Sequence, residues 1–369
     1  MWSLQPKQKQ SANLMKQAPS FWEKRHWKAW LLWPLSLLFF GITQLRLIAF
    51  ELGLLKSKSL PVPVIIIGNI RVGGTGKTPI VIAMAQALYE RGFKPGVISR
   101  GYSLNSRDSK NALEVDDHSD VNVVGDEPLV IHHYLRSLNI PIWIGANRVA
   151  CAEQLLKHHA NCDVILSDDG LQHYQLKRDP AREGGHDIEI VVQDARGTGN
   201  GFMLPAGPLR ESTHRERDIT LQTGLGIPSA NEAFIGSDEL PSTLFHVDVA
   251  IGKPYQLINP SNKQELLAFS NQQVLAAAGL GDPRKFFKLL ASKGLHCDTL
   301  ALPDHYSYHS NPFSTGINRQ YSKILITEKD AVKCQSFGDE RIWVVPLAAK
   351  LPSSCIDWIE AVLHRNTKA

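Results

Sequence analysis

A glycine-rich stretch near residue 75 contains the residue types that bind phosphate groups. Its six consecutive residues are Gly73, Gly74, Thr75, Gly76, Lys77 and Thr78. Glycines let backbone N–H groups converge on phosphate oxygens, Lys77 can reach the β and γ phosphates of a nucleotide, and the Thr78 hydroxyl can ligate Mg²⁺. The stretch therefore predicts a site for a nucleoside triphosphate with Mg²⁺.

The flanking sequence predicts the strand and the helix that such a loop needs. Residues 63–69 form a β-branched apolar run, typical of a strand buried on both faces of a parallel sheet, and residues 79–91 repeat apolar side chains at helical spacing. The usual pattern has glycine five residues before Gly76, where this chain has Arg71. We interpret the loop as a variant P-loop, and a glycine turn that binds nothing is disfavoured in this setting.

Two adjacent carboxylates follow a second buried strand pattern. Residues 162–167 read as that strand, and Asp168 and Asp169 come directly after it. Ligands of open α/β sheets gather at the carboxyl ends of the strands, so either aspartate could hold Mg²⁺ directly or through water. The alternative is a solvated Asp-Asp-Gly turn, which the upstream loop makes less favoured.

The N-terminal region combines positive charge with an apolar segment. The first 28 residues contain six lysines and arginines but a single acid, Glu23, and seventeen residues without formal charge separate Lys28 from Arg46. Three interpretations remain open: a helix lying in a membrane interface, which we favour, a spanning helix, and a core helix packed on the body. A cleaved signal peptide is disfavoured because no small-residue cleavage motif follows the apolar run.

Bulk composition limits the remaining possibilities. A chain of 369 residues exceeds what one hydrophobic core usually serves, so two lobes are expected. The net charge of +4 is too small to indicate nucleic-acid binding. Five cysteines without a CxxC pair indicate neither a disulfide scaffold nor a zinc site, which fits a reducing cytoplasmic compartment.

Several motifs in a fixed order resemble the tetraacyldisaccharide 4'-kinase family. They lie at residues 69–79, 99–102, 125–128, 167–173, 204–211 and 327–333, and the resemblance runs from about residue 20 to residue 362. It implies transfer of the γ-phosphate of ATP to the 4'-hydroxyl of a tetraacylated glucosamine disaccharide 1-phosphate, which yields lipid IVA in lipid A biosynthesis. It also implies a position on the cytoplasmic face of the bacterial inner membrane, with the N-terminal helix at the membrane surface. We expect no nucleic-acid partner and no obligate protein partner.

The same resemblance implies roles for residues that local patterns leave open. The family's catalytic acid falls on Asp126 and its partner histidine on His305, and an imidazole can orient a carboxylate that accepts the sugar hydroxyl proton. Taken singly, Asp126 is more typical of a helix N-cap and His305 of a surface turn. Arg100 is expected near a phosphate of ATP or of the lipid. Further candidates near the site are Arg148, Arg210, His173 and Lys333.

The predicted fold class is α/β, with a mostly parallel sheet of the P-loop NTPase type flanked by helices. We expect a polar, disorder-prone stretch at 1–19, a membrane-associated helix at 20–55, the P-loop lobe at 56–233 and a smaller α/β lobe at 234–369. Residues 180–187 look like a tolerated surface-loop insertion. The rival interpretation is a membrane-surface switch ATPase of the septum-site and partition class. Those loops carry lysine directly before the two glycines, where this chain has Val72.

Overall fold

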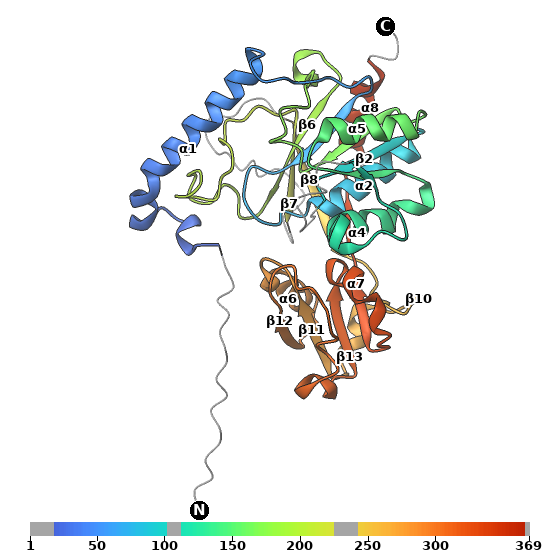
Figure 1. Cartoon of the computed structure of the whole chain (residues 1–369). Helices are drawn as coiled ribbons and strands as arrows, with labels where there is room; N and C mark the ends of the chain where they lie inside the picture. The colour runs from blue at the N-terminus through green and yellow to red at the C-terminus, as the bar shows by residue number, and fades with distance from the viewer. Residues whose placement is uncertain (1–17, 102–111, 225–242, 366–369) are drawn as a thin grey trace, which may run out of the picture.

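The computed structural model describes residues 18–101, 112–224 and 243–365. It contains a larger lobe, a smaller lobe beside it, and a long helix, α1 (Trp27–Glu51), that runs along one side of the larger lobe (Figure 1). Most of the predicted polar stretch, residues 1–17, lies outside the described residues. The predicted α/β class is confirmed.

The larger lobe is built on a nine-stranded sheet in the order β15-β8-β7-β6-β1-β5-β2-β4-β3. Its strands from β8 to β4 run parallel, and β15 and β3 pair antiparallel at the two edges. The strands are β1 (Val64–Gly68), β2 (Pro95–Ser99), β3 (Leu113–Glu114), β4 (Ile142–Ile144), β5 (Val164–Asp168), β6 (Ile188–Asp194), β7 (Ile219–Gly224), β8 (Thr243–Ile251) and β15 (Leu347–Lys350).

Helices cover both faces of this sheet, which is why β1 is apolar at every position. Ile65 and Ile67 point into a core shared with α2, α4 and α8, and Val64 and Ile66 into a second core with α5. The helices of this lobe are α2 (Lys77–Glu90), α3 (Val121–Val124), α4 (Asp126–Leu135), α5 (Arg148–His158) and α8 (Ser353–His364). The predicted strand and helix around the glycine-rich loop are therefore confirmed as β1 and α2.

The smaller lobe has its own six-stranded sheet, in the order β10-β9-β14-β13-β11-β12. Its elements are β9 (Tyr255–Gln256), β10 (Asn259–Lys263), β11 (Val274–Ala278), α6 (Pro283–Ser292), β12 (Asp298–Ala301), β13 (Lys323–Thr327), α7 (Glu328–Cys334) and β14 (Ile342–Val345). Short 3-10 turns lie at Ser20–Trp22, Arg136–Leu138, Ala181–Glu183, Leu266–Phe269, Gly316–Gln320 and Gln335–Phe337.

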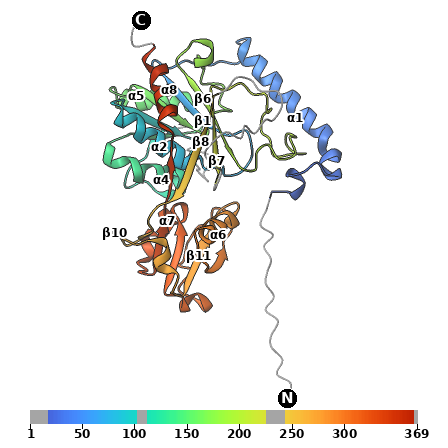
Figure 2. The ribbon, with the colours of Figure 1, turned by 180° about the vertical axis from the view of Figure 1, so that it is seen from behind.

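The division between the lobes differs from the predicted boundary at 233/234. That boundary itself falls in 225–242, outside the described residues. Sheet membership assigns β8, β15 and α8 to the larger lobe, although the prediction placed them in the smaller one. β8 pairs parallel with β7, with Ile219 opposite Thr243, and α8 buries Ile356 and Ile359 in the core that contains α2. Figure 2 shows α8 standing against the larger lobe.

Helix α1 is long, continuous through Pro34 and poorly covered by the rest of the chain. Only Ala29 and Ser36 are buried, while Leu31 is 72% and Leu38 is 62% exposed. The Ser36 hydroxyl donates to Met203 O at 2.7 Å and accepts from Ala206 N at 3.0 Å, which fastens one side of the helix to the body. The interpretation of a core helix is therefore wrong. By length and composition α1 could cross a membrane.

The segment 180–187 is more firmly built in than a surface insertion. Asp187 is buried, and its carboxylate accepts from Val64 N at 2.8 Å and from Asp179 N at 2.7 Å. It thereby satisfies the backbone at the start of β1, the strand that leads to the glycine-rich loop. The expectation of a freely tolerated loop is wrong for Asp187, although Glu183 on the same segment is exposed.

Candidate active site

The glycine-rich loop joins the carboxyl end of β1 to the first turn of α2. Gly73 and Gly76 have φ values of +105° and +82°, which side chains with a Cβ rarely adopt. Asn69, fully buried at the end of β1, donates from Nδ2 to Gly73 O at 3.1 Å and accepts from Lys77 Nζ at 3.3 Å. The loop and its lysine are thus fixed by one amide side chain that sequence reasoning did not select.

Arg71 explains how the variant loop is accommodated. Its side chain is buried, and Nη1 donates to Arg196 O at 3.1 Å and to Gly197 O at 3.3 Å. Nη2 pairs with Glu23, which lies just before α1. Arg71 therefore joins the base of the P-loop to the 196–197 turn and to the N-terminal segment, so the 196–201 stretch is a packed turn.

The two adjacent aspartates have opposite environments. Asp168 ends β5, next to β1, and its Oδ2 accepts from Ser99 Oγ at 3.0 Å while Oδ1 has no partner. Burial, with the negative charge of Glu127 adding to it, raises the pKa of Asp168.

Asp169 has φ +49° and lies 3.3 Å from Lys77 Nζ and 3.4 Å from Arg210 Nη1. Burial opposes its ionisation, but those two cations outweigh burial and lower the pKa of Asp169.

These residues suit a magnesium ion better than a metal that is coordinated by protein side chains alone. Among the described residues, no three His, Cys, Asp or Glu side chains come together as a metal cluster. Mg²⁺ needs few protein ligands, because substrate phosphates and water complete its octahedron. The unpartnered Oδ1 of Asp168 and the buried Thr78 at the loop's end supply the hard oxygen atoms that it prefers.

A second cluster forms where the two lobes meet. Asp126 is the first residue of α4, and its Oδ2 lies 2.9 Å from Lys333 Nζ on α7 and 3.3 Å from His305 Nδ1. Burial opposes ionisation of Asp126, but the hydrogen bonds from His305 and Lys333 hold its pKa well below the usual range. The same hydrogen bond raises the pKa of His305. Asp126 and His305, which only the family resemblance paired, are therefore adjacent.

The smaller lobe also contacts the P-loop itself. Lys285 on α6 lies 2.8 Å from Gly74 O and 3.0 Å from Asp194 Oδ2 at the end of β6. Arg196 donates to the same Gly74 carbonyl at 3.0 Å and pairs with Asp194. Both clusters, the phosphate loop and Asp126, therefore lie at the interface between the lobes.

Three further candidates, Arg148, His173 and Arg100, lie near the carboxyl ends of β5 and β2. Arg148 is buried and donates to Gly145 O at 2.7 Å and to Asp168 O at 3.1 Å, so it holds the end of β5. Burial, together with the charges of Arg148 and Arg100, lowers the pKa of His173 to about 4. Arg100 is exposed directly after β2, whose carboxyl end adjoins that of β5.

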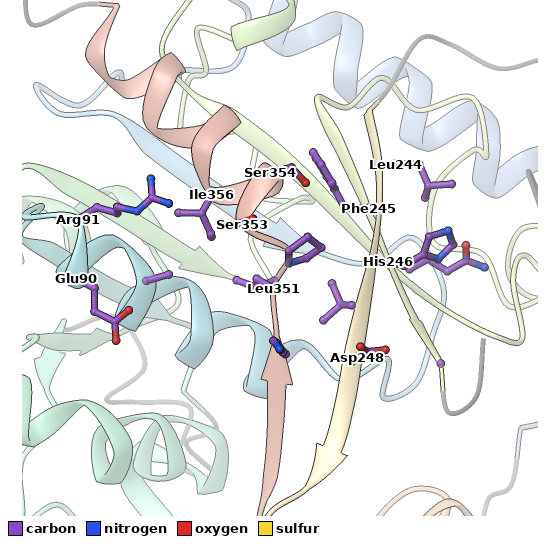
Figure 3. Close-up of a pocket in the computed structure, with 16 residues that line it drawn as sticks. Glu90, Arg91, Leu244, Phe245, His246, Asp248, Leu351, Ser353, Ser354 and Ile356 are labelled. Carbon is purple, nitrogen blue, oxygen red and sulfur yellow. The ribbon is translucent and has the colours of Figure 1, made fainter. Parts of the chain in front are cut away.

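A groove of about 730 Å³ lies elsewhere, between the end of α2, strands β7 and β8, and the start of α8 (Figure 3). Arg91, His246 and Asp248 are among its lining residues. None of the predicted site residues lines it. The groove is therefore separate from the phosphate loop and from Asp126.

The central strand β1 of a parallel sheet leads into a P-loop, and an acidic pair lies at the end of β5, the strand beside it. These features define a P-loop nucleotide-dependent enzyme, here with a second lobe. The chain belongs to the tetraacyldisaccharide-1-P 4'-kinase family, whose model matches residues 28–364. The resemblance expected from the sequence is confirmed, and the switch ATPase interpretation is not favoured.

Individual relatives agree with this membership. The chain is 48% identical to a tetraacyldisaccharide 4'-kinase of Polynucleobacter asymbioticus, over 96% of this chain and 98% of that protein. It is 42% identical to the protein of the same name from Herminiimonas arsenicoxydans, over 94% of this chain and 95% of that protein. The crystal structure of LpxK from Aquifex aeolicus in complex with ATP has a TM-score of 0.71 at 26% identity, covering 91% of this chain and 98% of that one.

Proposed function

We propose that this chain transfers the γ-phosphate of ATP to the 4'-hydroxyl of a tetraacylated glucosamine disaccharide 1-phosphate. The product would be lipid IVA, on the route to lipid A. The observation that carries the proposal is the meeting of Asp126 with His305 and Lys333 across the lobe interface, in a family member whose smaller lobe also touches the P-loop.

The nucleotide would be held by the backbone and by one lysine. N–H groups of Gly73, Gly74, Thr75 and Gly76 would surround the phosphate oxygens, and Lys77 would neutralise charge on the β and γ phosphates. Lys77 lies near Asn69 and Asp169, both within 3.3 Å, so it is held at the mouth of the loop. Arg100 at the end of β2 is proposed as a further phosphate contact.

Thr78 and Asp168, with Asp169 beside them, would hold Mg²⁺. When bound, Mg²⁺ neutralises charge that develops on the transferring phosphoryl group. Asp169 would keep Lys77 and Arg210 in place through its two ion pairs. The Ser99 hydroxyl fixes the orientation of Asp168, which leaves its second oxygen available.

Asp126 would orient the sugar hydroxyl and accept its proton, and His305 would orient Asp126. A carboxyl with so low a pKa is a weak base. Phosphoryl transfer through a loose transition state depends mainly on positioning and charge, so a weak base that accepts the proton late is sufficient. We therefore assign Asp126, His305 and Lys77 as the catalytic residues.

The membrane would supply the lipid substrate along α1. Its exposed apolar side chains suit a membrane interface or a span, and all five cysteines are free, as in a reducing compartment. We therefore propose the cytoplasmic face of the inner membrane as the site of action.

The test is a phosphotransfer assay with purified protein, ATP radiolabelled at its γ-phosphate, Mg²⁺ and lipid disaccharide 1-phosphate. Wild type is expected to label the lipid and to lose that activity when Mg²⁺ is chelated. Asp126→Asn should lower turnover by roughly 10²-fold or more, because the proton acceptor is lost, while ATP binding stays unchanged. Lys77→Ala should weaken both turnover and ATP binding.

The control measures inorganic phosphate in the same samples. Release of free phosphate without any labelled lipid would contradict the proposal and support a switch ATPase. Full activity of Asp126→Asn would leave the kinase assignment intact but remove the role given to that carboxylate.

A further inference from the structure

The Oδ2 atom of Asp126 has two partners from the smaller lobe, and they differ in how firmly they are held. Lys333 lies on α7 and its side chain is 9% exposed, whereas the side chain of His305 is 48% exposed. His305 also has φ +53°, in the left-handed region that residues other than glycine adopt only under constraint. Lys333 is thus the buried partner and His305 the accessible one.

The helix that carries Lys333 is anchored at its first turn. Thr327 caps α7, and its hydroxyl donates to Asp330 Oδ2 at 2.6 Å. The Asp330 carboxylate in turn accepts from Gly279 N at 3.1 Å, at the end of β11. Lys333 therefore extends from a fixed helix toward α4, and its ammonium position is set by the sheet of the smaller lobe.

A neighbouring pair provides an internal comparison. Lys329, one helical turn before Lys333, forms an ion pair with Glu127, the residue after Asp126. Both lysines therefore cross the same interface between α7 and α4, but only Lys333 donates to the Asp126 carboxylate. Loss of Lys329 removes a similar charge from the interface without removing a partner of Asp126.

We propose that Lys333 is a positioning residue of the phosphotransfer reaction, which holds the Asp126 carboxylate, together with His305, in the orientation that receives the acceptor hydroxyl. The inference rests on the proposed kinase function. Asp126 Oδ1 accepts from Glu127 N at 2.9 Å, and each carboxylate oxygen can accept more than one hydrogen bond. The acceptor hydroxyl can therefore reach Asp126 from the exposed side near His305 while the buried Lys333 stays in place.

The charges around Asp126 support this division of roles. Lys333 and Lys329 on α7 and His305 on the loop between β12 and β13 act on Asp126. Asp304 faces His305, and Glu127 on α4 pairs with Lys329. When His305 is neutral, Lys333 still supplies a positive charge next to Asp126. If Lys333 were lost, the carboxylate would depend on a histidine that changes its own charge near neutral pH.

The first test is histidine-ring NMR titration of the full-length protein, with the His305 signal assigned by its loss in His305→Gln. Lys333→Met should raise the pKa of His305, because a neighbouring positive charge is removed while Asp126 remains. Lys329→Met should leave that titration close to wild type, and Lys333→Arg should restore it. Identical titrations in Lys333→Met and wild type would overturn the inference.

The second test is the pH dependence of kcat/KM for lipid phosphorylation. In Lys333→Met the pKa of Asp126 should rise by roughly 1–3 units, so the acidic limb should move to higher pH and activity should be lost first at low pH. Lys333→Arg should keep the wild-type limb. A uniform loss at every pH, matched by Lys329→Met, would mean that Lys333 only holds the lobes together.

The two tests separate failure of the inference from failure of the proposed function. If wild type phosphorylates no lipid, the kinase proposal fails, yet the NMR titration still measures whether Lys333 controls the Asp126–His305 pair. Thermal unfolding of all four variants shows which of them fold, and Lys333→Arg retains the charge where Lys333→Met proves unstable.

Discussion

At the scale of single residues, two side chains of the proposed site sit on unusual backbone. Asp169 and His305 have φ values of +49° and +53°, and neither is glycine. Such conformations cost of order 1–3 kcal/mol and persist where surrounding structure enforces them, which is common at functional sites. Both residues carry side chains that contact other proposed site residues, Lys77 and Asp126 respectively.

The pH dependence of stability should reveal the Asp126–His305 pair. The raised pKa of His305 means that its contribution to stability is fully present below the unfolded value near 6.5 and is lost as pH rises through the folded pKa. The lowered pKa of Asp126 gives a contribution that is lost only in strong acid.

We therefore expect His305→Gln to lower the unfolding temperature more at pH 5.5 than at pH 9. The measurement is thermal unfolding of both proteins across that range. His309→Gln, which changes an exposed histidine on the same loop, serves as the control. An equal effect of His305→Gln at both pH values would show that the pair does not titrate as assigned.

Local sequence patterns predicted the phosphate-binding part of the proposed site, but they could not predict the contacts between the lobes. The P-loop and the Asp168 pair are local patterns, since the residues of each are contiguous and follow a buried strand. Asp126 and His305 lie on different lobes, so only the resemblance joined them. Asn69 and the partners of Arg71 were missed, because a buried amide and a buried guanidinium find partners only through the tertiary fold.

At the scale of elements, parallel strands were the easiest to predict. β1, β2 and β5 are buried at every position and β6 at its first five, so they read as mostly apolar runs, with the buried Glu189 as an exception in β6. The prediction placed β8 and β15 in the smaller lobe, because the sequence of a strand carries no local sign of which sheet it joins.

Asp187 offers a test of how an apparent insertion supports an element. Asp187→Ala would leave the N–H groups of Val64 and Asp179 without their acceptor, and one of these begins β1. We expect a loss of about 1–3 kcal/mol in the free energy of unfolding, measured by denaturant titration. Glu183→Ala, on the exposed part of the same segment, should change it by less than about 0.5 kcal/mol. Equal effects of the two variants would contradict the anchoring role.

At the scale of the whole molecule, α1 gives one side of the larger lobe an apolar surface that the described chain does not cover (Figures 1 and 2). Leu31, Leu38 and Leu45 are 72%, 62% and 68% exposed. Burial of a leucine side chain is worth about 1.5–3 kcal/mol, so a few such residues provide a substantial affinity for lipid.

We expect Leu31→Glu with Leu38→Glu to reduce partitioning into anionic phospholipid vesicles by at least about tenfold, measured by co-flotation. The matched control is Leu267→Glu with Ile317→Glu, which places the same charges at exposed apolar positions of the smaller lobe. Equal partitioning of the two double variants would mean that α1 is not the membrane contact.

The path of the chain through the two lobes determines when each can be completed during translation. The smaller sheet uses one continuous stretch from Tyr255 to Val345, whereas the larger sheet needs β15 and its core needs α8, which are synthesised last. While the ribosome is still adding α8, the surface of α2 that α8 will cover stays exposed. The smaller lobe can therefore be completed before the core of the larger lobe is closed by α8.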